Sequence, residues 1–81
     1  MIKVLFFGSL SDAAQPLSCE LPKDVNTVAD LAFWLASNNP LLIHGLAAEG
    51  VRIAVNQTMT DKKALIKDGD EIAFMSPLSG G

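Results

Sequence analysis

The chain ends in a pair of glycines, Gly80 and Gly81, which offer the clearest chemistry in the sequence. Neither carries a side chain, so both can enter a channel too narrow for a residue with a Cβ atom. The α-carboxylate of Gly81 is inert by itself, but adenylation by ATP would turn it into an acyl donor that a sulfur nucleophile can attack. The last six residues, 76–81, could carry this carboxylate about 20 Å from a folded domain. A terminal Gly-Gly alone is a weak signal, because chain termini are often rich in small residues.

The other reactive side chains carry weaker signals still. Cys19 could be imagined as a persulfide carrier, but it alternates with two leucines, which is typical of a half-buried strand residue. His44 has no Asp, Glu or Cys nearby in sequence that would indicate a triad or a metal site. Asp68, Asp70 and Glu71 lack the full ligand spacing of a calcium loop, so a solvated turn is expected there. We therefore expect no bound metal and no bound cofactor.

Charge and composition exclude several classes of partner. Nine acidic and six basic residues give a net charge of −3, which is the wrong sign for binding a phosphate backbone. A basic protein surface is the more natural match. Cys19 is the only cysteine, so an internal disulfide and a cysteine-rich metal site are excluded. No apolar run approaches the roughly 20 residues of a membrane span, and the opening segment lacks the cleavage site of a signal peptide. We expect a cytoplasmic protein that binds neither nucleic acid nor membrane.

The 81 residues are expected to form one domain with a core. Asn26 or Thr27 is well placed as a helix N-cap, with Asp30 in the capping position three residues after Thr27. Pro40 ends this helix, because the residue before a proline is pushed out of the α conformation. The predicted strands are 2–7, 17–21, 51–55, 58–60 and 71–75, with a wide loop at 10–16 and an irregular or short helical connector at 41–48.

This order of hairpin, helix and further strands predicts an α+β fold of the β-grasp (ubiquitin-like) type. Such a fold has a mixed sheet with one main helix on one face. We expect the β-grasp domain to span 1–75 and a flexible Gly-Gly tail to span 76–81. The glycine pair gains weight in this context, because it ends a compact acidic domain directly after the last strand.

The period of two along each strand divides the sheet into two faces. Because Lys3 is hard to bury, its face of the first strand should point away from the helix. The same reasoning in the other strands leaves an apolar patch on the uncovered face, formed by Leu5, Phe7, Ala54, Met59, Ala73 and Met75. Exposed patches of this kind usually mark an interaction surface, although the connector 41–48 could instead fold over this face and hide it.

Four segments in combination make the chain resemble the ubiquitin-like sulfur-carrier family, and within it the small subunits of molybdopterin synthase. They are 2–8 (IKVLFFG), 54–57 (AVNQ), 68–74 (DGDEIAF) and 77–81 (PLSGG). The resemblance covers essentially the whole chain. Carriers of the thiamin pathway share the fold and the Gly-Gly end but are typically shorter and lack the Phe-Phe-Gly opening. One departure is Ser76, where the family usually has a second proline, and this change is expected to loosen the base of the tail.

The resemblance implies a sulfur-transfer cycle in molybdenum cofactor biosynthesis. A ubiquitin-activating-like enzyme would adenylate the Gly81 carboxylate with ATP, and a sulfur donor protein would convert the acyl-adenylate to a thiocarboxylate. The tail would then enter the large subunit of the synthase and donate sulfur to cyclic pyranopterin monophosphate. The chain would be no enzyme on its own, because the catalytic side chains belong to the large subunit, with which it would form a two-plus-two heterotetramer. The implied threading residues are Pro77, Leu78, Ser79 and Gly80, and the implied interface residues are Leu5, Phe7, Met59 and Met75.

Other functions remain open on the sequence. The chain could carry sulfur for another pathway, such as thiamin synthesis or thiolation. It could be a protein modifier that forms isopeptide bonds through Gly81, which predicts lysine conjugates. It could also be an interaction module with an incidental Gly-Gly, which predicts that loss of Gly81 is harmless.

Overall fold

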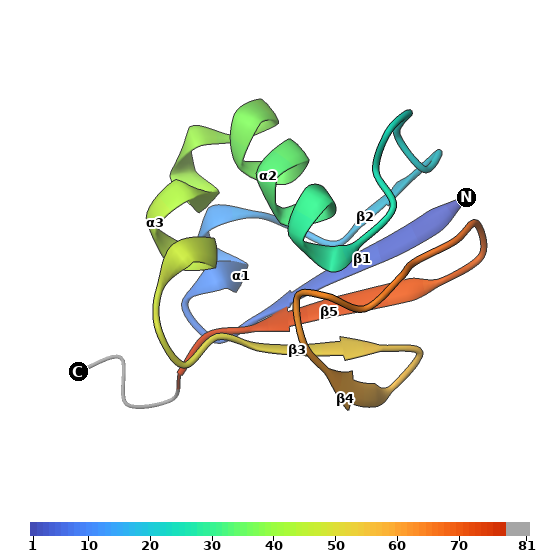
Figure 1. The fold of residues 1–81 in the computed structure, drawn as a ribbon. Coiled ribbons are helices and arrows are strands. Elements are labelled where there is room, and N and C mark those ends of the chain that lie inside the picture. The colour runs from blue at the N-terminus through green and yellow to red at the C-terminus, as the bar shows by residue number, and fades with distance from the viewer. Residues whose placement is uncertain (78–81) are drawn as a thin grey trace.

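The computed structural model describes residues 1–77, which form a five-stranded sheet with helices packed on one face (Figure 1). The strands are β1 (Ile2–Phe7), β2 (Leu17–Cys19), β3 (Arg52–Val55), β4 (Thr58–Thr60) and β5 (Glu71–Met75). The helical elements are α1 (Leu10–Ala13), α2 (Val28–Asn38), the 3-10 turn η1 (Pro40–Leu42) and α3 (Ile43–Ala47). No helix within residues 1–77 combines the length and the apolar character needed to cross a membrane.

The sheet is mixed, with the strand order β2-β1-β5-β3-β4. β1 and β5 are parallel neighbours, whereas the other three pairs are antiparallel. The last strand of the chain thus lies in the centre of the sheet beside the first, with α2 over one face (Figure 1). This topology confirms the predicted β-grasp fold.

The main helix begins and ends where the sequence predicted. The Thr27 hydroxyl accepts a hydrogen bond from the Asp30 N–H at 3.2 Å, and the Asp30 carboxylate accepts one from the Thr27 N–H at 3.2 Å. This reciprocal pair is a capping box, and it selects Thr27 over Asn26 as the N-cap. At the other end, Asn39 is the C-cap and Pro40 opens η1. Local side-chain chemistry therefore fixes both ends of α2.

The structure corrects the prediction for one segment, 10–16, and makes it more specific for another, 41–48. The expected wide loop at 10–16 contains α1, whose Leu10 is 2% exposed. Leu10 is held there by α3, since a Cβ added at Gly45 would lie 2.6 Å from the Leu10 Cδ2 atom. The connector 41–48 forms most of η1 and α3, and it buries Leu42 and Leu46. Both segments are ordered by burying leucines rather than by their own helix propensity.

The core lies between the sheet and the helices. Phe6 of β1 and Phe74 of β5 are register partners, and their stacked rings have centroids 6.1 Å apart. Leu42 and Leu46 of the connector belong to the same buried cluster. The connector therefore lies on the helix side of the sheet (Figure 1), and the alternative in which it hides the opposite face is wrong.

A polar cluster around the buried Asp70 joins the β3–β4 turn to the start of β5. Asn56 and Gln57 form this turn with φ angles of 52° and 68°, as a two-residue hairpin of the I′ type requires. The Asn56 amide donates to the Asp70 carboxylate at 2.9 Å, and its oxygen accepts from the Glu71 N–H at 2.9 Å. Asp70 is 4% exposed and also accepts from the Lys67 N–H at 2.9 Å. These bonds satisfy a carboxylate that burial would otherwise destabilise.

Candidate functional site

The uncovered side of the sheet carries an apolar row that crosses four strands. In the strand register, Leu5 of β1 pairs with Ala73 of β5. Ala73 pairs with Ala54 of β3, which in turn pairs with Met59 of β4. Directly paired residues point to the same side of a sheet, so all four share one face. Met59 is 54% exposed, whereas Ala54 and Ala73 are buried. The alanine methyl groups are short, so the longer side chains of neighbouring residues shield them from solvent.

A second row crosses the end of the sheet from which the tail leaves. Phe7 pairs with Met75, and Met75 pairs with Arg52. Phe7 is 49% exposed. We call the six apolar residues of the two rows the open face: Leu5, Phe7, Ala54, Met59, Ala73 and Met75. The strand period predicted this grouping, and the register confirms that the six share a face.

Three charged residues lie in strand rows beside the open face, and the sum of their charges is not negative, unlike the net charge of −3 of the whole chain. Arg52 lies in the Phe7–Met75 row, and Lys3 pairs with Glu71 in the row at the opposite end. Of these three residues in the described chain, two are basic and one is acidic. The net charge of the chain therefore does not by itself indicate the charge of a partner that would dock here.

The tail begins beside the open face, at the end of β5. Ser76 directly follows Met75, and its N–H donates to the Phe7 carbonyl at 3.2 Å. The Ser76 hydroxyl donates to the same carbonyl at 3.2 Å and accepts from the Ser9 N–H at 2.7 Å. The expectation that Ser76 loosens the base of the tail is wrong, because these three hydrogen bonds tie it to the end of β1.

Of the predicted tail residues, Pro77 lies within the part of the chain that the structure describes. It is half-buried beside Gly50. Leu78, Ser79, Gly80 and Gly81 lie outside the described residues. Their roles, including that of the Gly81 carboxylate, stay predictions. Sequence reasoning missed the hydrogen bonds of Ser76. Gly8, directly after the first strand, was a signal that some backbone or side chain comes close there, but it did not indicate which one.

Three described residues have side-chain pKa values shifted from their ordinary values, and their environments are structural: a strand, a helix cap and a turn. Hydrogen bonds from Asn56 and Lys67 hold the pKa of the Asp70 carboxyl below its ordinary value, although burial opposes them. Backbone N–H groups at the start of α2 lower the pKa of Asp30. Burial raises the pKa of the Cys19 thiol, which disfavours the reactive thiolate. Within residues 1–77, no three His, Cys, Asp or Glu side chains come together in a way that could hold a metal ion.

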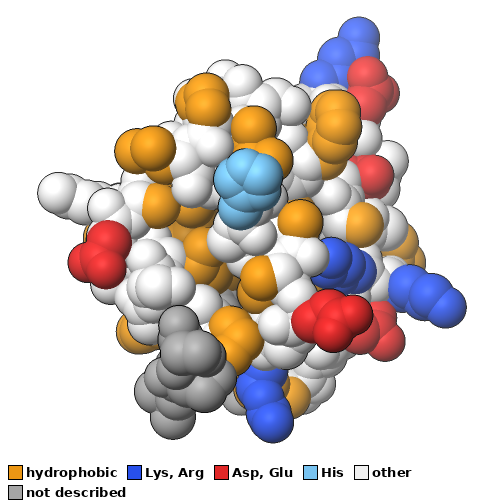
Figure 2. Space-filling model, turned by 90° about the vertical axis from the view of Figure 1, so that its left-hand side faces the viewer, with side chains coloured by type: hydrophobic (Ala, Val, Ile, Leu, Met, Phe, Trp, Pro, Cys, Tyr) orange, Lys and Arg blue, Asp and Glu red, His pale blue; other side chains and the backbone are white. Residues whose placement is uncertain are grey.

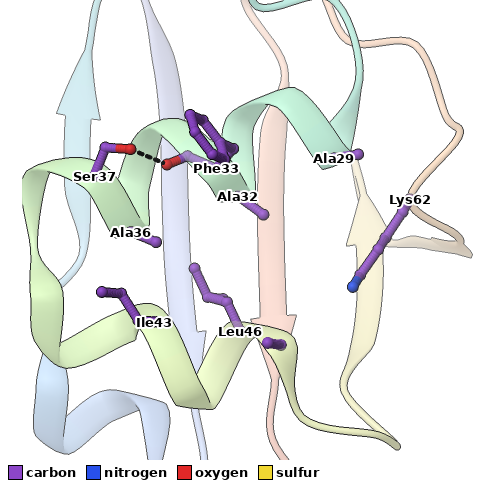
Figure 3. Close-up of a pocket in the computed structure, with 9 residues that line it drawn as sticks. Ala29, Ala32, Phe33, Ala36, Ser37, Ile43, Leu46 and Lys62 are labelled. Carbon is purple, nitrogen blue, oxygen red and sulfur yellow. Dashed lines mark hydrogen bonds between the residues drawn. The ribbon is translucent and has the colours of Figure 1, made fainter.

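A second apolar surface lies on the helix side. A groove of about 430 Å³ runs between α2 and α3, with Phe33 and Ile43 beside it and Lys62 reaching toward one end (Figure 3). Phe33 is 77% exposed and Ile43 is 48% exposed. Figure 2 shows the side of the molecule that lies at the left in Figure 1. Hydrophobic side chains lie around the histidine there, and most of the charged side chains lie on the right-hand part of this view. Of the described residues that line the groove, Lys62 alone is ionisable, so the groove offers a surface for contact rather than a reactive centre.

Known proteins are similar to this chain in sequence and in fold. The sequence model of the ThiS family matches residues 4–81. The molybdopterin synthase sulfur carrier subunit of Escherichia coli (strain K12) is 35% identical over 81 residues, which is 100% of each chain. SAMP1 from Haloferax volcanii has the same fold, with a TM-score of 0.77 at 22% identity over 99% of this chain and 98% of that one. A chain in the complex of subunits 1 and 2 of molybdopterin-converting factor from Helicobacter pylori 26695 gives a TM-score of 0.69 at 25% identity, covering 99% and 97%.

Proposed function

The chain belongs to the ThiS family, and we propose that it is the sulfur-carrier subunit of a molybdopterin synthase. One structural observation carries this proposal: the open face and the base of the tail are continuous. Phe7 and Met75 are paired on the open face, and the next residue after Met75 begins the tail. A partner docked on the open face therefore lies beside the segment that ends in Gly81. The full-length likeness to a sulfur carrier subunit supports the same function.

In this proposal the Gly81 carboxylate is the group that carries sulfur. On a ubiquitin-activating-like enzyme, one carboxylate oxygen attacks the α-phosphorus of ATP and pyrophosphate leaves. A persulfide on a donor protein then attacks the acyl carbon, and AMP leaves with that oxygen, which gives an acyl disulfide. A second thiol attacks the donor's sulfur in this disulfide, so a new disulfide forms on the donor side and Gly81 keeps a thiocarboxylate in which sulfur has replaced one oxygen. ATP is thus bound by the activating enzyme, and we place the cycle in the cytoplasm, where ATP is available.

The second half of the cycle takes place on the large subunit. The Helicobacter pylori structure is a complex of subunits 1 and 2, which supports a partner of this kind. About half of each side chain is already buried in the free chain, so burial of Phe7 and Met59 against that subunit would contribute about 1 kcal/mol each, before the costs of association. Residues 77–80 would thread the partner's site, where the sulfur passes to cyclic pyranopterin monophosphate. The chain supplies the docking surface and the carrier, and the partner supplies the catalytic side chains, in a two-plus-two assembly.

Reconstitution of the synthase tests this function. The thiocarboxylated chain, mixed with the large subunit and the pterin substrate, should yield the dithiolene product. A chain that lacks Gly81 should give none while it keeps the same thermal unfolding curve. Full product from the shortened chain would contradict the proposal, and lysine conjugates through Gly81 would favour a protein modifier instead.

A further inference from the structure

The base of the tail lies between two glycine turns. β5 lies between β1 and β3 in the sheet. Gly8 directly follows β1, which runs parallel to β5, and Gly50 comes shortly before β3, which runs antiparallel to it. Both turns therefore lie at the end of the sheet where β5 ends, one on each side of it. Residues 76 and 77 pass between them.

On the β1 side, the absence of a side chain at Gly8 makes room for Ser76. Gly8 has a φ of +70°, and a Cβ atom added there would lie 2.2 Å from the Ser76 Oγ atom and 3.3 Å from the Ser76 carbonyl oxygen. The first distance is far below a van der Waals contact. The Ser76 hydroxyl thus occupies the space that a Gly8 side chain would need. It uses that position to accept the Ser9 N–H at 2.7 Å.

On the β3 side, Gly50 makes room for Pro77. Gly50 has a φ of +85°, and a Cβ atom added there would lie 3.0 Å from the Pro77 Cγ atom. The proline ring is thus in close contact with the turn that leads into β3. Its own φ is fixed near −65° by the ring, so the ring contact and the three hydrogen bonds of Ser76 together restrain the backbone at both positions.

We propose that Gly8, Gly50 and Ser76 are positioning residues that fix the direction in which the tail leaves the sheet. The inference rests on the proposed function, in which Gly81 must find two active sites in turn. Residues 78–81 extend at most about 14 Å, so the point and direction of departure decide where the carboxylate can go. Freeing residues 76 and 77 would move the last restrained residue of the described chain back to Met75, so the tether between that residue and the Gly81 carboxylate would grow from four residues to six. The effective concentration of the carboxylate at a partner's active site falls with about the −3/2 power of tether length. Lengthening the tether from four to six residues thus lowers this concentration about twofold, and the loss of a fixed direction lowers it further.

The chain supplies a matched set of variants. Ser76→Ala removes the hydroxyl that binds Ser9 and Phe7, whereas Ser76→Thr keeps it. Gly8→Ala and Gly50→Ala place a methyl group against the tail. Gly69→Ala is the control, because Gly69 also has a positive φ, of +93°, yet an added Cβ atom would meet nothing within 4 Å. It therefore shares the backbone strain of the other two but leaves the tail untouched.

Two measurements on the full-length chain separate this inference from the proposed function. The first is the ¹⁵N order parameter of the Leu78 N–H in the free protein, which requires no sulfur chemistry. It should fall in Ser76→Ala, Gly8→Ala and Gly50→Ala, and match the native chain in Ser76→Thr and Gly69→Ala. Unchanged values in Ser76→Ala would overturn the inference, even if Gly8→Ala fails to fold.

The second measurement is the rate of single-turnover adenylation at a saturating concentration of the activating enzyme. The release of pyrophosphate reports this rate. The rate for Ser76→Ala should fall about two- to tenfold. The concentration for half-saturation should stay the same, because the substitution changes the position of the tail and not the surface of the domain. A change in half-saturation with an unchanged rate would overturn the inference. Absence of adenylation in the native chain would instead refute the proposed function. The order parameters would still show whether residues 76 and 77, at the base of the tail, are restrained.

Discussion

Phe7 and Met75 are paired at the last position of the parallel β1–β5 ladder, and both lie on the open face. The Phe7 carbonyl also accepts hydrogen bonds from the N–H and the hydroxyl of Ser76. A single residue of β1 therefore contributes its side chain to the open face and its backbone to the base of the tail. In the proposed function, this link couples docking of a partner to delivery of the C-terminal carboxylate.

The role of Phe7 in docking can be measured directly. Phe7→Ala should weaken binding of the large subunit by about tenfold or more, because exposed aromatic anchors often dominate an interface. Its effect on the free energy of unfolding should be small, since half of the side chain is already in solvent. Titration calorimetry gives the affinity. Phe33→Ala, a truncation of an exposed phenylalanine on the helix side, is the control and should bind normally; equal effects of the two changes would contradict the assignment.

The edge strand β4 offers a test of which face is used. Met59→Asp would place a charge on the open face, and burying it against a partner without an opposite charge is costly. We expect affinity for the large subunit to drop at least tenfold. Thr60→Asp changes the neighbouring residue, which points to the other side of the strand, and should leave the affinity nearly unchanged. Surface plasmon resonance on both variants decides, and a larger effect from Thr60→Asp would show that the partner docks elsewhere.

Stability should depend on pH through Asp70. Hydrogen bonds from Asn56 and Lys67 hold its pKa below the ordinary value in the folded chain. The ionised carboxylate therefore stabilises the fold above the unfolded-state pKa of about 3.9, and this contribution is lost as the pH falls through the folded pKa. Asp30, whose pKa is also lowered, acts in the same direction. The free energy of unfolding should thus be flat above about pH 5 and decrease below about pH 4.

A substitution assigns this acid sensitivity to one residue. Asp70→Asn should lower the free energy of unfolding at pH 7 by about 1–3 kcal/mol, because it disrupts hydrogen bonds of a buried group. It should also flatten the decrease at low pH. Urea denaturation across the pH range measures both effects. Asp12→Asn, at an exposed position of α1, should keep the native slope, and an undiminished slope in Asp70→Asn would refute the assignment.

The capping box of α2 predicts a simple stability difference. Thr27→Ala removes the hydroxyl that accepts the Asp30 N–H and should cost about 1 kcal/mol of unfolding free energy. Thr27→Ser keeps the hydroxyl and should cost much less. Chemical denaturation compares them. If serine and alanine were equally destabilising, the loss would come from packing of the threonine methyl group rather than from the cap.

The sequence predicted the features that depend on short-range patterns. The two-residue period placed Leu5 and Phe7 on the open face, and the Thr27–Asp30 spacing located the start of α2. It did not predict α1, since that helix forms because Leu10 packs against the distant Gly45. The hydrogen bonds of Ser76 were missed for the same reason. Ser9 and Ser76 are 67 positions apart, and no local pattern shows that the sheet brings them together.

Mass spectrometry of the intact chain tests the central claim most directly. The protein is incubated with a ubiquitin-activating-like enzyme, ATP and a sulfur source, beside the same chain lacking Gly81. The account predicts a mass gain equal to the exchange of one oxygen for one sulfur, which fragmentation maps to Gly81, and no gain in the shortened chain. An unchanged mass, under conditions that convert the Escherichia coli sulfur carrier subunit, would contradict the claim that this chain carries sulfur.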